Sequence, residues 1–105
     1  MAKVALIFGS GLGAHFPEDA LAAALAEIPF KAVFAAHADP LDRLADLAVP
    51  VAVPAEKSGT YININGLRQT FGRALEPLPG VVAERTILAA LARAWGGEAG
   101  EADGR

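Results

Sequence analysis

The apolar residues of this chain fall into short runs separated by glycine, proline and acidic residues. Val4 to Phe8 is an uninterrupted apolar run that ends at Gly9, as expected for a strand buried on both faces of a parallel sheet. Residues 32–36 and 49–53 form two similar runs. Pro50 and Pro54 interrupt hydrogen bonding along the last of them, which favours a position at the sheet edge or an irregular extended segment. The pattern therefore predicts three short strands.

Apolar side chains at helical spacing lie between and after these strands. Pro17 suits the first turn of a helix that continues through Leu21 and Leu25. Asp39 is the expected N-cap of a second, leucine-rich helix that reaches residue 47. Residues 84–95 carry an apolar stripe at the same spacing and predict the last helix.

Asn65-Gly66 lies between two alternating runs, which is a strong signal for a β-hairpin. A two-residue type I′ turn at this dipeptide sets the register of the two strands. The expected apolar face then consists of Ile62, Ile64, Leu67 and Phe71. The expected polar face consists of Tyr61, Asn63, Arg68 and Thr70. We expect the ribbon to bury its apolar face on the sheet and to present its polar face.

The order of strand, helix, strand, helix, strand, hairpin and helix predicts an α/β fold. We expect a small, mostly parallel, Rossmann-like sheet with flanking helices and an attached hairpin. The length of 105 residues fits one domain. That single domain is expected over residues 1–95, followed by a glycine-rich flexible tail over residues 96–105.

Composition excludes several classes of function. The formal net charge is −3, without a basic block, so nucleic-acid binding has little support. The chain contains no cysteine, which excludes disulfides and cysteine-ligated metal centres. No apolar stretch reaches the roughly 18 residues of a membrane span, so we expect no membrane insertion. The absence of cysteine fits a cytoplasmic location.

The glycines after the first strand are a candidate nucleotide site. Gly9 and Gly11 begin a run to Ala14 that fits the dinucleotide fingerprint. In that motif the glycines open the helix directly, whereas the helix signals here begin only at Pro17. The acid required for the ribose would be Asp39, which is already the expected helix cap. A flexible loop between strand and helix is the alternative interpretation.

Other chemistry-bearing residues have weaker support. His15 and His37 each follow a predicted strand and would suit a metal, or would simply be solvated. Ser58 and Thr60 lack the surroundings of a catalytic nucleophile. Gly59 between them is expected to supply an unusual backbone angle at the entrance of the hairpin.

The polar face of the hairpin is a candidate binding surface. Asn63 and Arg68 are expected to be cross-strand neighbours that grip a carboxylate or phosphate, or dock a neighbouring domain. Glu56 and Lys57 precede the hairpin and belong to the same group of charged and polar residues. An ordinary solvated face is the alternative.

The centre of the chain resembles a signature of the molybdopterin oxidoreductase superfamily. The matching residues read ADLAVP at positions 45–50, AEKSGTY at positions 55–61, and then Asn63, Gly66 and Gln69. The serine before the Gly-Thr pair is most similar to the large iron–sulfur subunits of bacterial NADH–quinone oxidoreductase, respiratory complex I. The resemblance extends from about residue 30 to residue 95. The glutamate and arginine that flank the family's glycine are Asn65 and Leu67 here.

The resemblance implies a structural and interaction domain of an electron-transferring oxidoreductase, with no catalytic residue and no redox centre of its own. Iron–sulfur clusters are then expected elsewhere in the parent protein, on the cytoplasmic side of the inner membrane. Its partners would be other domains or subunits of the complex. The expected interface residues are Glu56, Lys57, Ile62, Ile64 and Leu67. A pterin-contacting domain of an active molybdopterin enzyme, using Asn63 and Arg68, is the alternative that the same resemblance allows.

Overall fold

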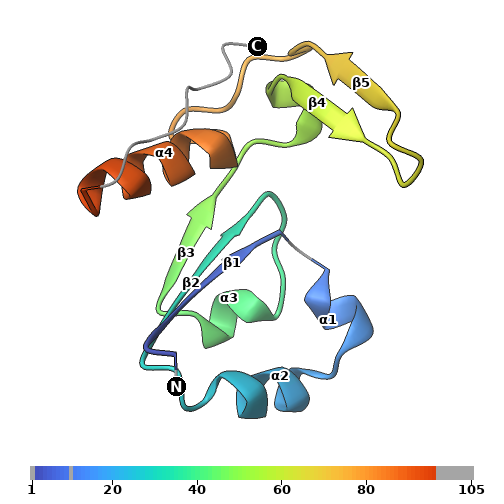
Figure 1. The fold of residues 1–105 in the computed structure, drawn as a ribbon. Helices are drawn as coiled ribbons and strands as arrows, with labels where there is room; N and C mark the ends of the chain where they lie inside the picture. The colour runs from blue at the N-terminus through green and yellow to red at the C-terminus, as the bar shows by residue number, and fades with distance from the viewer. Residues whose placement is uncertain (1, 10, 97–105) are drawn as a thin grey trace. The chain divides into compact units, whose positions relative to one another are not determined.

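The computed structural model describes residues 2–9 and 11–96 and shows a small α/β protein. The chain forms two compact units, Met1–Val51 and Ala52–Arg105. The first contains a three-stranded parallel sheet with helices, and the second a separate antiparallel hairpin and one longer helix (Figure 1). The fold class predicted from the sequence is confirmed. The single domain over residues 1–95 stays a prediction, and the tail lies outside the described residues from position 97 onward.

The first unit contains three strands and three short helices. They are β1 (Val4–Phe8), α1 (Leu12–His15), α2 (Glu18–Leu25), β2 (Phe30–Ala35), α3 (Leu41–Leu44) and β3 (Leu47–Pro50). The second unit contains η1, a turn of 3-10 helix (Pro54–Glu56), β4 (Gly59–Ile62), β5 (Arg68–Phe71) and α4 (Glu84–Ala94).

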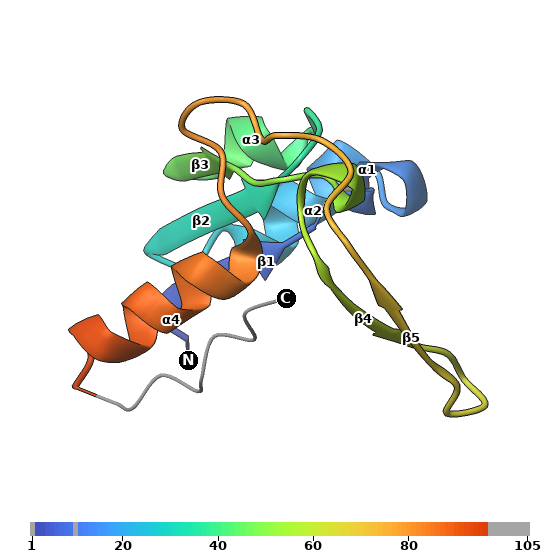
Figure 2. The ribbon, with the colours of Figure 1, turned by 90° about the horizontal axis from the view of Figure 1, so that it is seen from above.

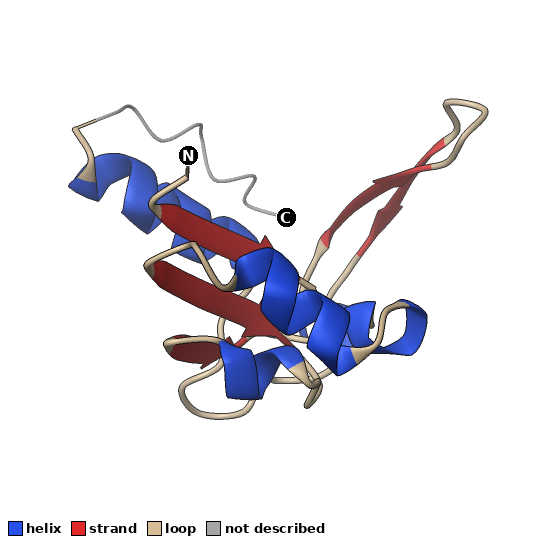
Figure 3. Cartoon of the chain, turned by 90° about the horizontal axis from the view of Figure 1, so that it is seen from below, coloured by secondary structure: helices blue, strands red, loops and turns tan. Residues whose placement is uncertain are grey.

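The parallel sheet has the order β1-β2-β3, so β3 lies at an edge, as Pro50 predicts. Val33 in the central strand is opposite Ile7 on one side and Ala48 on the other. The helices of both connections lie on one face of this sheet (Figure 3). There Leu21 of α2 and Leu41 of α3 pack with Val33 to form the core of the unit. On the opposite face the rings of Phe8 and Phe34 stack with their centroids 4.5 Å apart.

The second predicted helix is shorter than expected, and the third strand begins earlier. Helix α3 is a single turn, because Ala45 leaves the helical conformation with ψ at 150°. Asp46 then joins the sheet: its amide donates to the Lys31 carbonyl at 2.8 Å, and its carboxylate accepts the Lys31 amide at 2.9 Å. Leu47 is therefore in β3 opposite Ala32, and not in the helix. Helical spacing of leucines could not reveal this long-range pairing.

The predicted hairpin is present, but its register is shifted by one residue. Tyr61 is opposite Gln69 and Ile62 is opposite Arg68, so the loop has three residues and not two. The Asn63 side chain stabilises this loop, because its Oδ1 accepts the amides of Asn65 and Leu67, each at 2.9 Å. Gly66 adopts the left-handed conformation, with φ at 83°, which is typical of a three-residue hairpin with a glycine bulge.

The shifted register corrects the predicted faces of the ribbon. Side chains alternate along a strand, so Phe71 shares a face with Tyr61, and their rings stack at 4.9 Å. Ile62 lies instead on the face that carries Arg68. The two strands run side by side as a two-stranded ribbon (Figure 2).

The ribbon does not bury its apolar side chains as predicted. The exposed fractions are 59% for Ile62, 100% for Ile64 and 56% for Leu67. The one-residue shift divides the expected apolar face between the two sides of the ribbon, so neither side carries a continuous stripe.

Candidate functional site

Glycines shape the loop that follows β1. Gly9 and Gly11 have φ values of 109° and 107°, a region that side chains with a Cβ rarely adopt. Gly13 serves a different purpose, because a Cβ at this position would lie 2.7 Å from Cδ of Pro40. Gly13 belongs to α1 (Leu12–His15), a helix that the sequence patterns did not predict. Gly9 and Gly11 therefore permit the turn of the backbone after β1, and Gly13 permits the close approach of the chain to Pro40.

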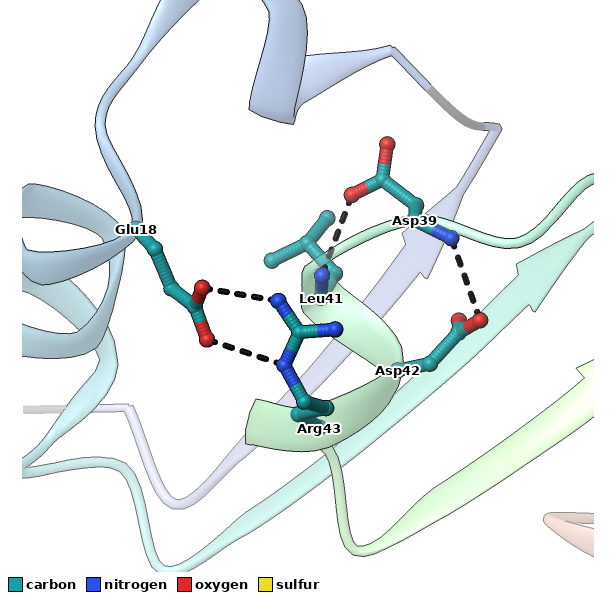
Figure 4. Close-up of polar contacts among 5 residues, drawn as sticks. All are labelled: Glu18, Asp39, Leu41, Asp42 and Arg43. Carbon is teal, nitrogen blue, oxygen red and sulfur yellow. Dashed lines mark hydrogen bonds and ion pairs between the residues drawn. The ribbon is translucent and has the colours of Figure 1, made fainter.

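Asp39 ties the glycine loop to the start of α3. One carboxylate oxygen accepts the Leu41 amide at 3.0 Å, and the other accepts the Gly11 amide at 2.9 Å. Asp42 completes a reciprocal cap, because its carboxylate accepts the Asp39 amide at 3.1 Å (Figure 4). Asp39 thus bonds the first turn of α3 as expected of a cap, although the residue directly before the helix is Pro40. The bonds from Leu41 and then Gly11 lower the pKa of the Asp39 carboxyl below its usual range.

These contacts bear directly on the nucleotide hypothesis. The Gly11 amide donates to Asp39 within the chain, and the acid that would bind a ribose accepts two backbone amides. The loop lines a shallow cleft of about 320 Å³ together with Leu12 and His15. This internal pairing favours the interpretation of the glycines as a structural loop.

The two histidines line different clefts at the same edge of the sheet. His15 belongs to the cleft beside the glycine loop, and His37 to one of about 270 Å³ beside β2 and β3. Within residues 2–9 and 11–96, no group of three or more histidine, cysteine or acidic side chains is arranged to hold a metal ion.

An ion pair joins α2 to α3 in this unit. The Arg43 guanidinium donates from Nη2 to Glu18 at 2.8 Å and from Nε at 3.1 Å (Figure 4). This hydrogen-bonded pair lowers the pKa of Glu18 and raises that of Arg43. Both side chains are largely exposed, so the pair orients the helices more than it stabilises them.

We expect Asp39→Asn to destabilise the first unit by about 1 kcal/mol at pH 7, because asparagine keeps one acceptor oxygen where Asp39 accepts two amides. The folded-state pKa of Asp39 is lowered, so its stabilisation is complete above the unfolded value of about 3.9 and is lost as the pH falls through the folded value. Urea unfolding of the original chain and of Asp39→Asn should therefore show a smaller difference in the free energy of unfolding near pH 3 than at pH 7. Asp19→Asn is the matched control, since Asp19 bonds only its neighbouring amide. A difference that stays constant over this range would contradict the assignment.

Gly13→Ala should lower the free energy of unfolding by about 1–3 kcal/mol, because the new Cβ overlaps the ring of Pro40. Thermal unfolding without added ligand measures the effect. Gly72→Ala is the control, as a Cβ there meets no atom within 4 Å. Equal melting temperatures for the two variants would show that Gly13 is not a packing glycine.

In the second unit, the charged residues before the hairpin hold the fold together. Glu56 accepts two backbone amides, from Val53 at 3.1 Å and from Leu78 at 3.2 Å. It thereby joins the η1 turn to the segment that follows the hairpin. The Ala55 carbonyl reinforces this connection by accepting the amides of residues 74 and 75, both at 2.8 Å.

Lys57 and Ser58 connect the same segment to the start of α4. Lys57 Nζ donates to Glu84 at 2.8 Å, and their side chains are only 22% and 30% exposed. Arg85 donates to the Ser58 carbonyl at 2.9 Å. Together these residues line a cleft of about 230 Å³ at the base of the hairpin. Sequence patterns did not find Glu84 or Arg85, because they lie 27 residues from their partners.

Gly59 is required for packing and not for its backbone angle. It is absent from the glycines with positive φ in the described residues, so the predicted unusual angle is wrong. A Cβ at Gly59 would lie 3.2 Å from the Phe71 ring and 3.3 Å from Arg85. Among the described residues that line this cleft there is no histidine to activate Ser58 or Thr60, and the Thr60 hydroxyl lies 3.4 Å from that of Thr70.

Asn63 and Arg68 do not form the predicted cross-strand pair. In the observed register, Arg68 is opposite Ile62, and the Asn63 side chain bonds its own loop. The two residues therefore lie on opposite faces of the ribbon. Binding of one carboxylate or phosphate by both side chains would require them to lie on the same face of the ribbon. The observed register places them on opposite faces.

No protein-family model matches the chain, and no curated protein matches it at a significant level. In the part of the chain that the structure describes, no helix is both long enough and apolar enough to cross a membrane.

Proposed function

We propose that this chain is a structural and interaction domain of an electron-transferring oxidoreductase, within the large iron–sulfur subunit of an NADH–quinone oxidoreductase. The proposal starts from the AEKSGTY segment and the residues around it, which resemble that family. In this role the domain has no redox centre of its own. The iron–sulfur clusters belong to other parts of the parent protein, on the cytoplasmic side of the inner membrane. The domain neither binds nucleic acid nor inserts into the membrane.

One observation supports this role above the others. The charged residues of the AEKSGTY segment are bonded within the second unit, whereas the apolar residues that follow the segment are exposed. The charged pair Glu56 and Lys57 is engaged inside the second unit, with backbone amides and with Glu84. The apolar residues Ile62, Ile64 and Leu67 are exposed on the ribbon. A segment whose charges hold the fold and whose apolar groups face outward suits a docking element.

The proposal is tested on the intact natural polypeptide that contains this chain. It is affinity-tagged and purified, and its iron is measured together with the electron paramagnetic resonance of reduced clusters. We expect iron–sulfur signals and NADH-dependent electron transfer in the preparation, and neither in the purified 105-residue chain. A preparation without iron or NADH oxidation would contradict the proposal. A stoichiometric pterin in the intact protein would favour a domain that contacts an active molybdopterin cofactor.

A further inference from the structure

The hairpin combines exposed apolar groups with a basic side chain, Arg68. Ile64 at its turn is fully exposed, and Ile62 and Leu67 on either side are more than half exposed. Arg68 is opposite Ile62 in the register, so its guanidinium lies on the same face as that side chain. Leu67 lies on the opposite face of the ribbon from Ile62 and Arg68, so the exposed apolar groups surround the tip and do not form one flat patch. Exposed apolar side chains beside an arginine are a common composition for the centre of a protein interface.

The charge of this segment is opposite in sign to that of the whole chain. Residues 57–75 contain Lys57, Arg68 and Arg73 and no acidic residue, whereas the chain has a net charge of −3. Lys57 and Arg73 form ion pairs, each at 2.8 Å, with Glu84 and Glu76. Among the described residues, the Arg68 guanidinium has no hydrogen-bond or ion-pair partner. The ribbon therefore presents an arginine side chain with which no acidic side chain of residues 2–9 and 11–96 pairs.

We propose that the tip of this ribbon inserts into an apolar groove of another protein in the assembly, where a carboxylate at the groove rim pairs with Arg68. This inference rests on the proposed function for the existence of an assembly, and it adds the chemistry of the partner. Charge complementarity selects an acidic rim, because like charge opposite Arg68 would be repulsive.

The size of the patch favours this occupant over a second copy of the chain. A stable protein interface buries about 800 Å² on each partner, and three aliphatic side chains with one arginine supply much less. A small exposed patch is suited to a preformed groove, where the partner provides most of the buried surface. The net negative charge of the chain likewise disfavours a surface of anionic lipid.

Site-specific photo-crosslinking in cells tests the inference. The photoreactive residue p-benzoylphenylalanine replaces Ile64 in the natural polypeptide, and the same substitution at the exposed Leu78 is the control. We expect one discrete crosslinked protein at position 64, with aspartate or glutamate beside apolar residues in the crosslinked peptide. Arg68→Glu should reduce the yield about fivefold or more, the equivalent of roughly 1 kcal/mol. The exposed Arg93→Glu, with the same change of charge, should leave the yield unchanged.

The outcomes separate this inference from the proposed function. A crosslinked oxidoreductase subunit with an acidic groove supports both, and an acidic groove in an unrelated protein supports the docking mode but overturns the oxidoreductase assignment. Crosslinks only to a second copy, crosslinks no stronger than at position 78, or a yield unaffected by Arg68→Glu would each overturn the inference. Binding of the purified chain to phosphatidylglycerol vesicles that is lost in Arg68→Glu would also overturn it. Equal melting temperatures of the purified charge variants exclude misfolding as the cause.

Discussion

Leu41→Ala should lower the free energy of unfolding of the first unit by about 3 kcal/mol. Leu41 is only 1% exposed and packs with Leu21, Val33 and Ala35 in the core of that unit. Truncation removes buried apolar surface and leaves a cavity beneath the sheet. Leu41 is the buried residue of α3, which is a single turn. Urea unfolding followed by far-ultraviolet circular dichroism measures the loss.

Leu78→Ala provides the control for this experiment. Leu78 is 68% exposed, so its truncation should change the free energy of unfolding by less than about 0.5 kcal/mol. If Leu41→Ala were as mild as Leu78→Ala, the core between the sheet and its helices would be described wrongly.

Glu56→Ala is the second substitution with a large expected effect, a loss of about 2–3 kcal/mol. The carboxylate accepts the amides of Val53 and Leu78, and its removal leaves both donors without this acceptor. Bonds to charged acceptors are worth more than neutral ones, and Glu56 is half-buried. Thermal unfolding of the full chain, with hydrogen exchange at the two amides, measures the change.

Two further variants make the test of Glu56 specific. Glu56→Gln keeps an amide oxygen that can accept one bond, so its loss should be smaller than that of Glu56→Ala. Glu76→Ala removes another acid from the same unit, one whose side chain is 83% exposed in its pair with Arg73, and should have almost no effect. If Glu56→Ala lowered the free energy of unfolding no more than Glu76→Ala does, the structural role assigned to the AEKSGTY segment would be wrong.

Local patterns in the sequence predict most of the elements of this fold. The apolar run at β1 and the start of α4 match the observed boundaries at Val4–Phe8 and Glu84. The Asn-Gly dipeptide predicts the hairpin, and Asp39 predicts the cap. These signals are local, because each depends on residues within a few positions of one another.

The errors arise where a distant residue or a side chain competes with the local signal. Leu47 fits the spacing of the helix, but pairing between Asp46 and Lys31 draws it into β3. The turn at Asn65-Gly66 fits two residues, but the carboxamide of Asn63 stabilises a loop of three. The additional loop residue shifts the pairing of the two strands by one position. Asn63 and Arg68 therefore lie on opposite faces of the ribbon.

The candidate site was only partly predictable for the same reason. The sequence singles out Glu56 and Lys57, but it gives no indication of Glu84 as the partner of Lys57 across 27 positions. Of the two amide bonds of Glu56, the one from Val53 is local, three positions away, whereas the one from Leu78 spans 22 positions and has no local signal. The role of Gly59 in packing against Phe71 depends on the observed register and could not be read from the chain.

The central claim is that this chain docks through its exposed hairpin while its charged segment holds the fold. The most direct measurement is the amount of assembled complex recovered when Ile64→Ser and Leu67→Ser are introduced together into the natural polypeptide. We predict that the purified chain keeps its melting temperature, because both side chains are exposed, and that the assembled complex is lost. Normal assembly with both serines in place would contradict the account.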